Sequence, residues 1–180
     1  SWSDSKFLFT AGSIRPARGL EDLLRALLMV VLNGNKSIKL VIAGSISPRM
    51  DRYFNKLQYW IKTNGLQNNV AWAGKLNKYE MAWCFQRCEA FIMSSRVESF
   101  GMIAGEALAN GAVCISANNP CLPEIFDNAA LYYAPDNPED LYSRILEVFT
   151  LKPHERKKIS EMTIARSKIF SWDICAKKTI

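Results

Sequence analysis

The chain has 180 residues, of which 49% are hydrophobic and 22% charged; this fits a globular domain with an apolar core, and no apolar run is long enough to span a membrane. The formal net charge is +6 and the basic excess lies in residues 151–180, which favours a solvated helical face, a partner domain or an anionic membrane surface. Nucleic acid is disfavoured as a partner, because aromatic residues do not interleave with the basic ones.

Strand patterns alternate with helix patterns along nearly the whole chain. Short apolar runs predict strands, and apolar residues spaced three and four apart predict helices. Residues 1–6 are polar and are interpreted as a linker or the edge of the domain. In chain order we predict strand 7–10, helix 19–32, strand 38–43, helix 51–63, strand 70–73, helix 78–87, strand 90–93, helix 102–109, strand 112–116, a short helical turn at 123–127, strand 130–133, and helices at 138–150, 154–170 and 172–180.

This alternation predicts an α/β fold, a doubly wound Rossmann-like parallel sheet of about six strands with helices on both faces. Right-handed crossovers bring the carboxyl ends of all parallel strands to one edge of the sheet. Gly12, Gly44, Gly74 and Gly101 fall at those ends. That edge is where we expect a ligand site.

The sequence offers few residues for nucleophilic or metal chemistry. His154 is the only histidine and lies in a basic stretch typical of a solvated helix start. The chain therefore has no credible Ser-His-Asp or Cys-His pair and no multi-histidine metal site. The spacings of the five cysteines match no zinc or disulfide framework, and we interpret them as small buried residues in a reducing cytosol.

The loop after the first strand, residues 12–19, combines two glycines with Arg15 and Arg18. Glycine lets the backbone approach a ligand closely, and arginine can bind a diphosphate through two parallel hydrogen bonds. The loop matches neither a dinucleotide fingerprint nor a P-loop. An exposed polar turn with solvated arginines remains the alternative interpretation.

Glu98 and Glu106 flank the Phe100-Gly101 turn, and the turn begins a predicted helix. Glu98 alone suits a capping residue, and Glu106 alone suits an exposed helical residue. Together, two carboxylates around an amide-lined hole suit a ligand with hydroxyl groups on both sides of a diphosphate.

The run from Ser94 to Gly111, SSRVESFGMIAGEALANG, resembles the E-x7-E segment of retaining nucleotide-sugar glycosyltransferases. Leu122-Pro-Glu124 and the later segment 134–138 resemble two downstream motifs of the same family, and the loop 12–19 and the segment 70–74 resemble two upstream ones. The chain thus resembles the C-terminal, donor-binding half of a GT-B enzyme of glycosyltransferase family four (group 1). The similarity covers nearly all of it.

The resemblance implies roles for individual residues. Glu98 would hold hydroxyls of the donor sugar, Glu106 would hold the ribose, and Arg18 would neutralise the diphosphate; of these, Glu98 and Arg18 would be the catalytic residues. Backbone groups of Lys75 and Leu76 would meet the base. The full set of implied donor-binding residues is Gly12, Ser13, Arg15, Arg18, Gly44, Lys75, Leu76, Glu98, Phe100, Gly101, Met102, Ile103 and Glu106. The resemblance implies no metal and no cofactor apart from the nucleotide-sugar substrate.

Three positions depart from the family pattern. Ser13 stands where the family has an arginine, so half of a cation pair is missing and Arg15 is the candidate substitute. Ser94 and Val113 replace prolines, which concerns backbone stiffness rather than chemistry.

The resemblance predicts a domain, residues 7–170, that binds a nucleoside diphosphate sugar in a retaining transfer to an acceptor hydroxyl. The pathway would be polysaccharide, lipopolysaccharide or glycolipid synthesis. An N-terminal acceptor domain is expected outside this chain, and residues 171–180 are expected to form a helix that is cut short. The expected location is the cytoplasm, with peripheral contact with the inner face of the membrane. The alternatives are a GT-B nucleotide-sugar epimerase and a non-catalytic Rossmann module for protein or membrane contact.

Overall fold

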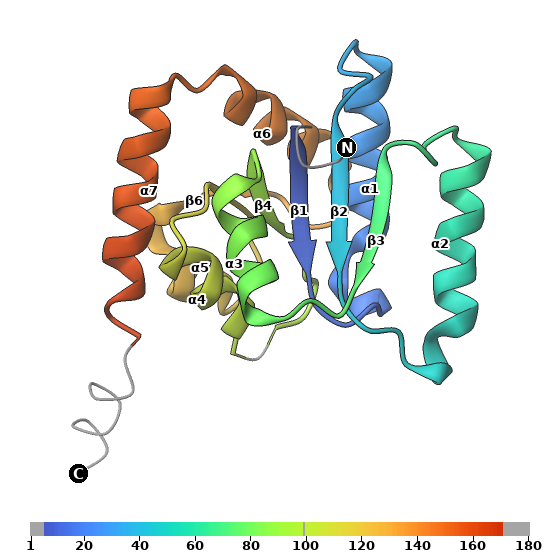
Figure 1. Cartoon of the computed structure of the whole chain (residues 1–180), viewed down its shortest axis with the longest axis horizontal. Coiled ribbons are helices and arrows are strands. Elements are labelled where there is room, and N and C mark those ends of the chain that lie inside the picture. Colours follow the sequence, from blue (N-terminus) through green and yellow to red (C-terminus); the bar gives the residue numbers. More distant parts are fainter. Residues whose placement is uncertain (1–5, 99, 171–180) are drawn as a thin grey trace.

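The computed structural model describes residues 6–98 and 100–170 (Figure 1). Its centre is a parallel sheet with the strand order β3-β2-β1-β4-β5-β6. The strands are β1 (Phe7–Ala11), β2 (Lys39–Ala43), β3 (Val70–Gly74), β4 (Ala90–Met93), β5 (Cys114–Ala117) and β6 (Ala130–Tyr133).

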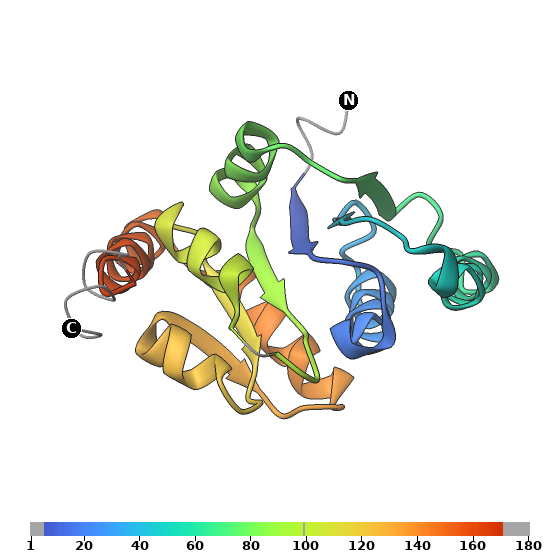
Figure 2. The same cartoon turned by 90° about the horizontal axis from the view of Figure 1, so that it is seen from below.

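Helices connect successive strands and cover both faces of the sheet. Figure 2 shows α1, α2 and α6 on one face and α3, α4 and α7 on the other. The helices are α1 (Leu20–Leu32), α2 (Asp51–Thr63), α3 (Lys78–Arg87), α4 (Met102–Ala109), α5 (Leu122–Phe126), α6 (Pro138–Thr150) and α7 (Pro153–Ser167). Three short 3-10 helices accompany them: η2 (Pro16–Arg18), η3 (Pro48–Met50) and η4 (Asp127–Ala129). The predicted α/β fold with a doubly wound parallel sheet is confirmed.

The core lies on both faces of β1 and β4, as their largely apolar sequences predict. Phe9, Phe85 and Phe91 are buried and contact one another, two of the three pairs edge to face. Cys84 and Cys114 are buried among these apolar residues, which confirms their interpretation as small core side chains. None of the helices in the described ranges is long and apolar enough to cross a membrane.

The start of β5 differs from the predicted one by two residues. Strand pairing begins at Cys114 rather than Ala112, because Ala112 still donates to the Ala107 carbonyl and so completes the end of α4. The last described helix ends at Ser167 instead of residue 170, and the predicted helix 172–180 lies outside the described residues.

The strand order reverses between β1 and β4, which are neighbours in the sheet but lie about 80 residues apart in sequence. Consecutive crossovers therefore leave in opposite directions here, and the loops that follow β1 and β4 meet at one point. In open α/β sheets such a switch point opens a crevice beyond the carboxyl ends of the strands. The fold thus brings residues 12–19 and residues 94–98 together.

Candidate active site

Arg18 and Glu98 form an ion pair at the switch point. The Arg18 Nη1 atom lies 2.8 Å from Glu98 Oε2 and also donates to Ser95 Oγ at 3.0 Å. Both charged side chains are largely buried, with 14% and 11% of their surface exposed. A buried guanidinium needs such a partner, because an isolated charge in this position would lose its hydration without compensation.

Gly12 provides the wall against which Arg18 lies. Its φ of 134° favours glycine, and a Cβ atom there would stand 2.6 Å from Arg18 Nε. The Nε atom is itself buried and has no hydrogen-bond partner in the described part of the chain. The glycine therefore makes room for the cation, and the cation keeps one donor that the protein does not use.

Backbone contacts hold the two loops together beside this ion pair. Ser94 Oγ donates to the Arg18 carbonyl at 2.7 Å, and the Arg96 N–H donates to the Ala17 carbonyl at 2.8 Å. Gly19 packs so closely on the Ser94 carbonyl that a Cβ atom would collide with it. We call this contact between residues 15–19 and 94–98 the loop junction.

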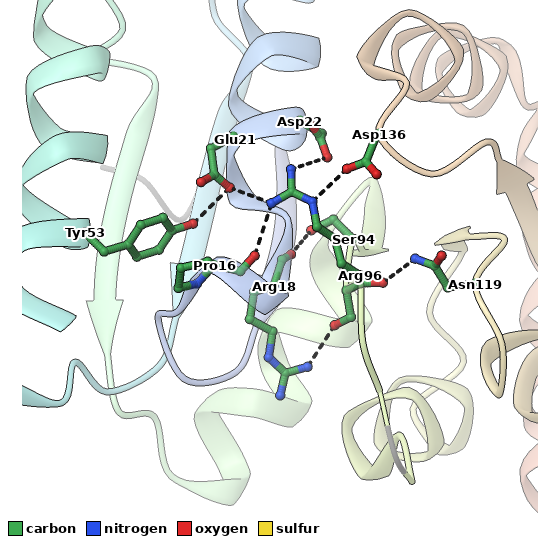
Figure 3. A network of polar contacts seen from close by, with 10 residues as sticks. Pro16, Arg18, Glu21, Asp22, Tyr53, Ser94, Arg96, Asn119 and Asp136 are labelled. Carbon is green, nitrogen blue, oxygen red and sulfur yellow. Dashed lines mark hydrogen bonds and ion pairs between the residues drawn. The ribbon is translucent and has the colours of Figure 1, made fainter. Parts of the chain in front are cut away.

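The side chain of Arg96 lies behind the loop junction and binds three carboxylates (Figure 3). Its nitrogen atoms lie 2.7 Å from Asp136, 3.0 Å from Asp22 and 3.3 Å from Glu21. Burial opposes the Arg96 charge, but hydrogen bonding and attraction from these carboxylates dominate and raise the Arg96 pKa above its ordinary value. The guanidinium is therefore charged throughout the physiological range.

Asp22 lies at the start of α1, where it is buried beside Arg96. Burial raises the pKa of the Asp22 carboxyl, and the attraction of Arg96 only partly opposes that rise. On the outer side of the network, Tyr53 of α2 donates its hydroxyl hydrogen to Glu21 at 3.0 Å. Burial and the neighbouring Glu21 raise the Tyr53 pKa, so this hydroxyl remains a donor.

Glu98 also orders the start of α4. The Gly101 N–H donates to Glu98 Oε1 at 3.3 Å, and Gly101 begins the helix in a left-handed conformation with φ 65°. Gly101 is buried against Ile125, where a Cβ atom would collide. Glu98 thus makes the capping contact that the sequence left open for it, together with an ion pair to Arg18 that the sequence did not predict.

A cavity of about 570 Å³ opens beside the loop junction. Residues from the ends of β1 and β2, the loop after β3, and helices α3 and α4 line it. The predicted site residues among its walls are Gly12, Ser13, Gly44, Lys75, Leu76, Ile103 and Glu106. A volume of this size is ordinary for a small-molecule site.

The other predicted residues are not among the cavity walls. Arg18, Glu98 and Gly101 lie at the loop junction or the start of α4. Arg15, Phe100 and Met102 have exposed side chains. The structure therefore brings the implied site together in two parts, and three of the implied side chains are exposed to solvent.

Glu106 is the acidic residue of the cavity. It belongs to α4, is exposed, and its carboxylate makes no hydrogen bond or ion pair within the described ranges. Lys78 also lines the cavity but was not predicted, because a lysine at a helix start has the appearance of a solvated residue. The described residues contain no group of three or more His, Cys, Asp or Glu that could hold a metal ion.

Comparison with known proteins identifies the family. A family model described as "Glycosyl transferases group 1" matches residues 2–166, and the chain therefore belongs to that family. An uncharacterised glycosyltransferase of Methanocaldococcus jannaschii is 28% identical over 174 residues, covering 96% of this chain and 46% of the relative. The chain thus spans about half the length of that curated relative.

Two solved structures show the same fold. The C-terminal domain of a glycosyl transferase group 1 protein from Francisella tularensis has a TM-score of 0.79 at 19% identity, covering 92% of this chain and 85% of that one. The HepE protein of Anabaena, in complex with UDP and glucose, has a TM-score of 0.82 at 17% identity, covering 92% of this chain and 44% of that one. The GT-B assignment of the fold is confirmed.

The sequence interpretation missed Ser95, Arg96 and their partners Asp22, Asp136 and Asn119. Asn119 donates to the Ser95 carbonyl at 2.7 Å and so anchors the loop junction from the β5 side (Figure 3). One signal was present: Arg96 follows directly on a buried strand and two serines, a place where ligand-site loops begin. Its acidic partners lie 40 and 74 residues away and have no mark in the sequence.

Proposed function

We propose that this domain binds a nucleoside diphosphate sugar and that the protein to which it belongs transfers the sugar to an acceptor hydroxyl with retention of configuration. The observation that carries the proposal is the position of Arg18, a largely buried cation beside a 570 Å³ cavity at the switch point. A diphosphate matches that cation in charge and geometry. The family membership and the UDP and glucose in the Anabaena protein support the same class of ligand.

The cavity suggests an orientation for the donor. The ribose hydroxyls would bind the Glu106 carboxylate, which has no competing partner in the described structure, and the base would meet the backbone at Lys75 and Leu76. The diphosphate would lie between Arg18 and the N-terminus of α4, whose free N–H groups favour an anion. The sugar would then face Glu98.

In the transfer step, this domain would stabilise the negative charge that develops on the departing diphosphate. Arg18 is held in place before the ligand arrives, so little reorganisation is needed during the reaction. Arg15 is exposed in the same loop and would supply the second cation that Ser13 does not provide. The acceptor proton would pass to the leaving phosphate oxygen, and no metal is required in this scheme.

A cytoplasmic location with peripheral membrane contact belongs to the same proposal. Helix α7 carries Lys157 and Lys158 on its exposed surface, and a lipid-linked acceptor would lie at such a surface. The acceptor domain would come from a separate part of the protein, as the length of the M. jannaschii relative suggests.

Binding measurements with UDP, GDP, CDP and ADP test the donor assignment. We expect one of them to bind, and Glu106→Ala to weaken that binding about tenfold, because a charge-assisted hydrogen bond to ribose is lost. Glu161→Ala, at an exposed position of α7, is the matched control and should change nothing. The 2′-deoxy form of the same nucleotide should bind equally to the parent and Glu106→Ala if the contact is to the 2′-hydroxyl.

Two results would overturn the proposal at different levels. If none of the four nucleotides binds, the donor-binding function is wrong. If a nucleotide binds with the same affinity before and after Glu106→Ala, the assignment of Glu106 to the ribose is wrong.

A further inference from the structure

Arg96 joins segments that are distant in sequence at the back of the loop junction. Besides the three carboxylates, its Nη1 atom donates to the Pro16 carbonyl at 3.2 Å, so the side chain serves four acceptors. Two of these, Glu21 and Asp22, belong to the first turn of α1, and Asp136 precedes α6. Figure 3 shows the guanidinium at the centre of these groups.

The contacts of Arg96 converge on the backbone that carries Arg18. The Arg96 side chain binds the Pro16 carbonyl, its own N–H binds the Ala17 carbonyl, and the neighbouring Ser94 hydroxyl binds the Arg18 carbonyl. Three consecutive carbonyls of η2 are thus fixed from the β4 side. These bonds fix the backbone from which the Arg18 side chain extends, and the contacts with Ser95 and Glu98 then hold its guanidinium.

The direction of the two arginines separates their roles. Arg18 extends towards Ser95 and Glu98, to which it donates. Figure 3 shows Arg96 extending in another direction, towards Asp22 of α1 and Asp136. Arg96 is not among the cavity walls. It therefore has no direct path to a ligand in the cavity, and any influence on binding must act through the junction.

We propose that Arg96 is a positioning residue for the diphosphate: its bonds to α1, η2 and Asp136 hold η2 so that the Arg18 guanidinium stands ready beside the cavity. The inference rests on the proposed function, because it takes Arg18 as the diphosphate ligand. It goes beyond that function because it names a residue that does not line the cavity, Arg96, as the one that holds Arg18 in position. Lysine cannot replace Arg96 here, because one ammonium group does not reach four acceptors arranged around a planar fork.

A double-mutant cycle between Arg96→Lys and Arg18→Met tests the proposal. The full chain is titrated with whichever of UDP, GDP, CDP or ADP binds, and then with the corresponding monophosphate. We expect Arg96→Lys to weaken diphosphate binding about tenfold and monophosphate binding less than about twofold, since only the diphosphate depends on a well-placed Arg18. In the Arg18→Met background, Arg96→Lys should have no further effect on diphosphate affinity.

The matched control is Arg156→Lys. Arg156 is similarly half-buried and binds a carboxylate and two backbone carbonyls, but it joins α7 to Glu89 and Val148 away from the cavity. This control should lower the thermal midpoint while leaving both affinities unchanged below it. The control therefore separates an effect on the position of Arg18 from a general loss of protein stability.

Each outcome of the cycle decides something. Equal loss of diphosphate and monophosphate affinity in Arg96→Lys, or effects of the two substitutions that simply add, would overturn the positioning role. If Arg18→Met alone leaves diphosphate affinity unchanged, the assignment of Arg18 in the proposed function fails, and the Arg96 inference fails with it. A diphosphate-selective loss that disappears without Arg18 supports both.

Discussion

The two halves of the site, the loop junction and the cavity, differ in whether their charged side chains are paired with other groups of the protein. At the loop junction, Arg18, Glu98 and Arg96 bind one another or nearby loops through short hydrogen bonds and ion pairs. On the cavity side, Glu106 and Lys75 are exposed and have no such partner in the described structure. The charged groups of the loop junction are therefore already paired before a ligand binds, whereas those of the cavity are available to a ligand.

This difference has a physical reason in burial. A charge that the fold buries must be paired, or folding loses its hydration energy. A charge at the rim of a cavity keeps its water until a ligand replaces it, so it needs no internal partner. The site thus combines a cation, Arg18, that needs no rearrangement when a ligand binds, with an exposed acceptor for hydroxyl groups, Glu106.

Gly44 lines the cavity and lies against Gly12, the residue that packs on Arg18, and changing Gly44 should have the largest effect. A Cβ atom at Gly44 would collide with the Gly12 carbonyl, and its φ of 149° is unfavourable for other residues. We expect Gly44→Ala to lower the free energy of unfolding by about 3 kcal/mol, because strain and a backbone collision add. Urea denaturation monitored by circular dichroism measures the change.

Gly34→Ala is the control for that substitution. Gly34 also has a positive φ, 107°, but nothing lies within 4 Å of the position of its Cβ atom. Gly34→Ala should lower the free energy of unfolding only through backbone strain, by about 1 kcal/mol. Equal losses in the two variants would show that the close approach of Gly44 to the Gly12 carbonyl does not limit stability, and the cavity wall beside Arg18 would not depend on it.

Substitution of the two glutamates tests the comparison directly. Glu98→Gln removes the charged partner of Arg18 and weakens the bond to the Gly101 N–H, so we expect a loss of about 2 kcal/mol of folding free energy. Glu106→Gln changes an exposed residue without an internal partner and should stay within about 0.5 kcal/mol of the parent. Thermal and urea unfolding of both variants measure the difference. A larger loss for Glu106→Gln would reverse the assignment of the two halves.

The sequence predicted the frame of the site better than its internal contacts. The alternation of apolar runs and helical spacing is a local signal, and it was enough for the doubly wound sheet and for placing Gly12, Gly44 and Glu106 at one edge. The pairing of Arg18 with Glu98 spans 80 residues and depends on β1 and β4 being neighbours. No local pattern encodes that neighbourhood.

The contacts of Arg96 could not be predicted from the sequence either. An arginine in a polar loop is usually solvated, and only the fold reveals that the acceptors of Arg96 come from η2, α1 and the loop before α6. The predicted start of the fifth strand was early for a different reason, since Ala112 still bonds to the Ala107 carbonyl at the end of α4. Tertiary contacts decided the first case and a local helix-end contact the second.

The smallest expected effect concerns the pH dependence contributed by Asp22. Burial raises the pKa of this carboxyl in the folded protein above the unfolded value, despite Arg96 at 3.0 Å. The folded state therefore binds more protons than the unfolded state between the two pKa values, so this group's contribution to stability falls as the pH rises through its folded pKa. Asp22→Asn lacks that titration.

Urea unfolding of the parent and Asp22→Asn from pH 4 to pH 7 measures this contribution. Asp22→Asn should become more stable relative to the parent as the pH rises, because only the parent carries the penalty of an ionised buried carboxyl, which Arg96 offsets in part. A variant that instead loses stability relative to the parent with rising pH would mean that the attraction of Arg96 exceeds the cost of burial. In that case the loop junction would be a source of stability at neutral pH, and its ordered charges would be explained by folding alone rather than by the placement of Arg18.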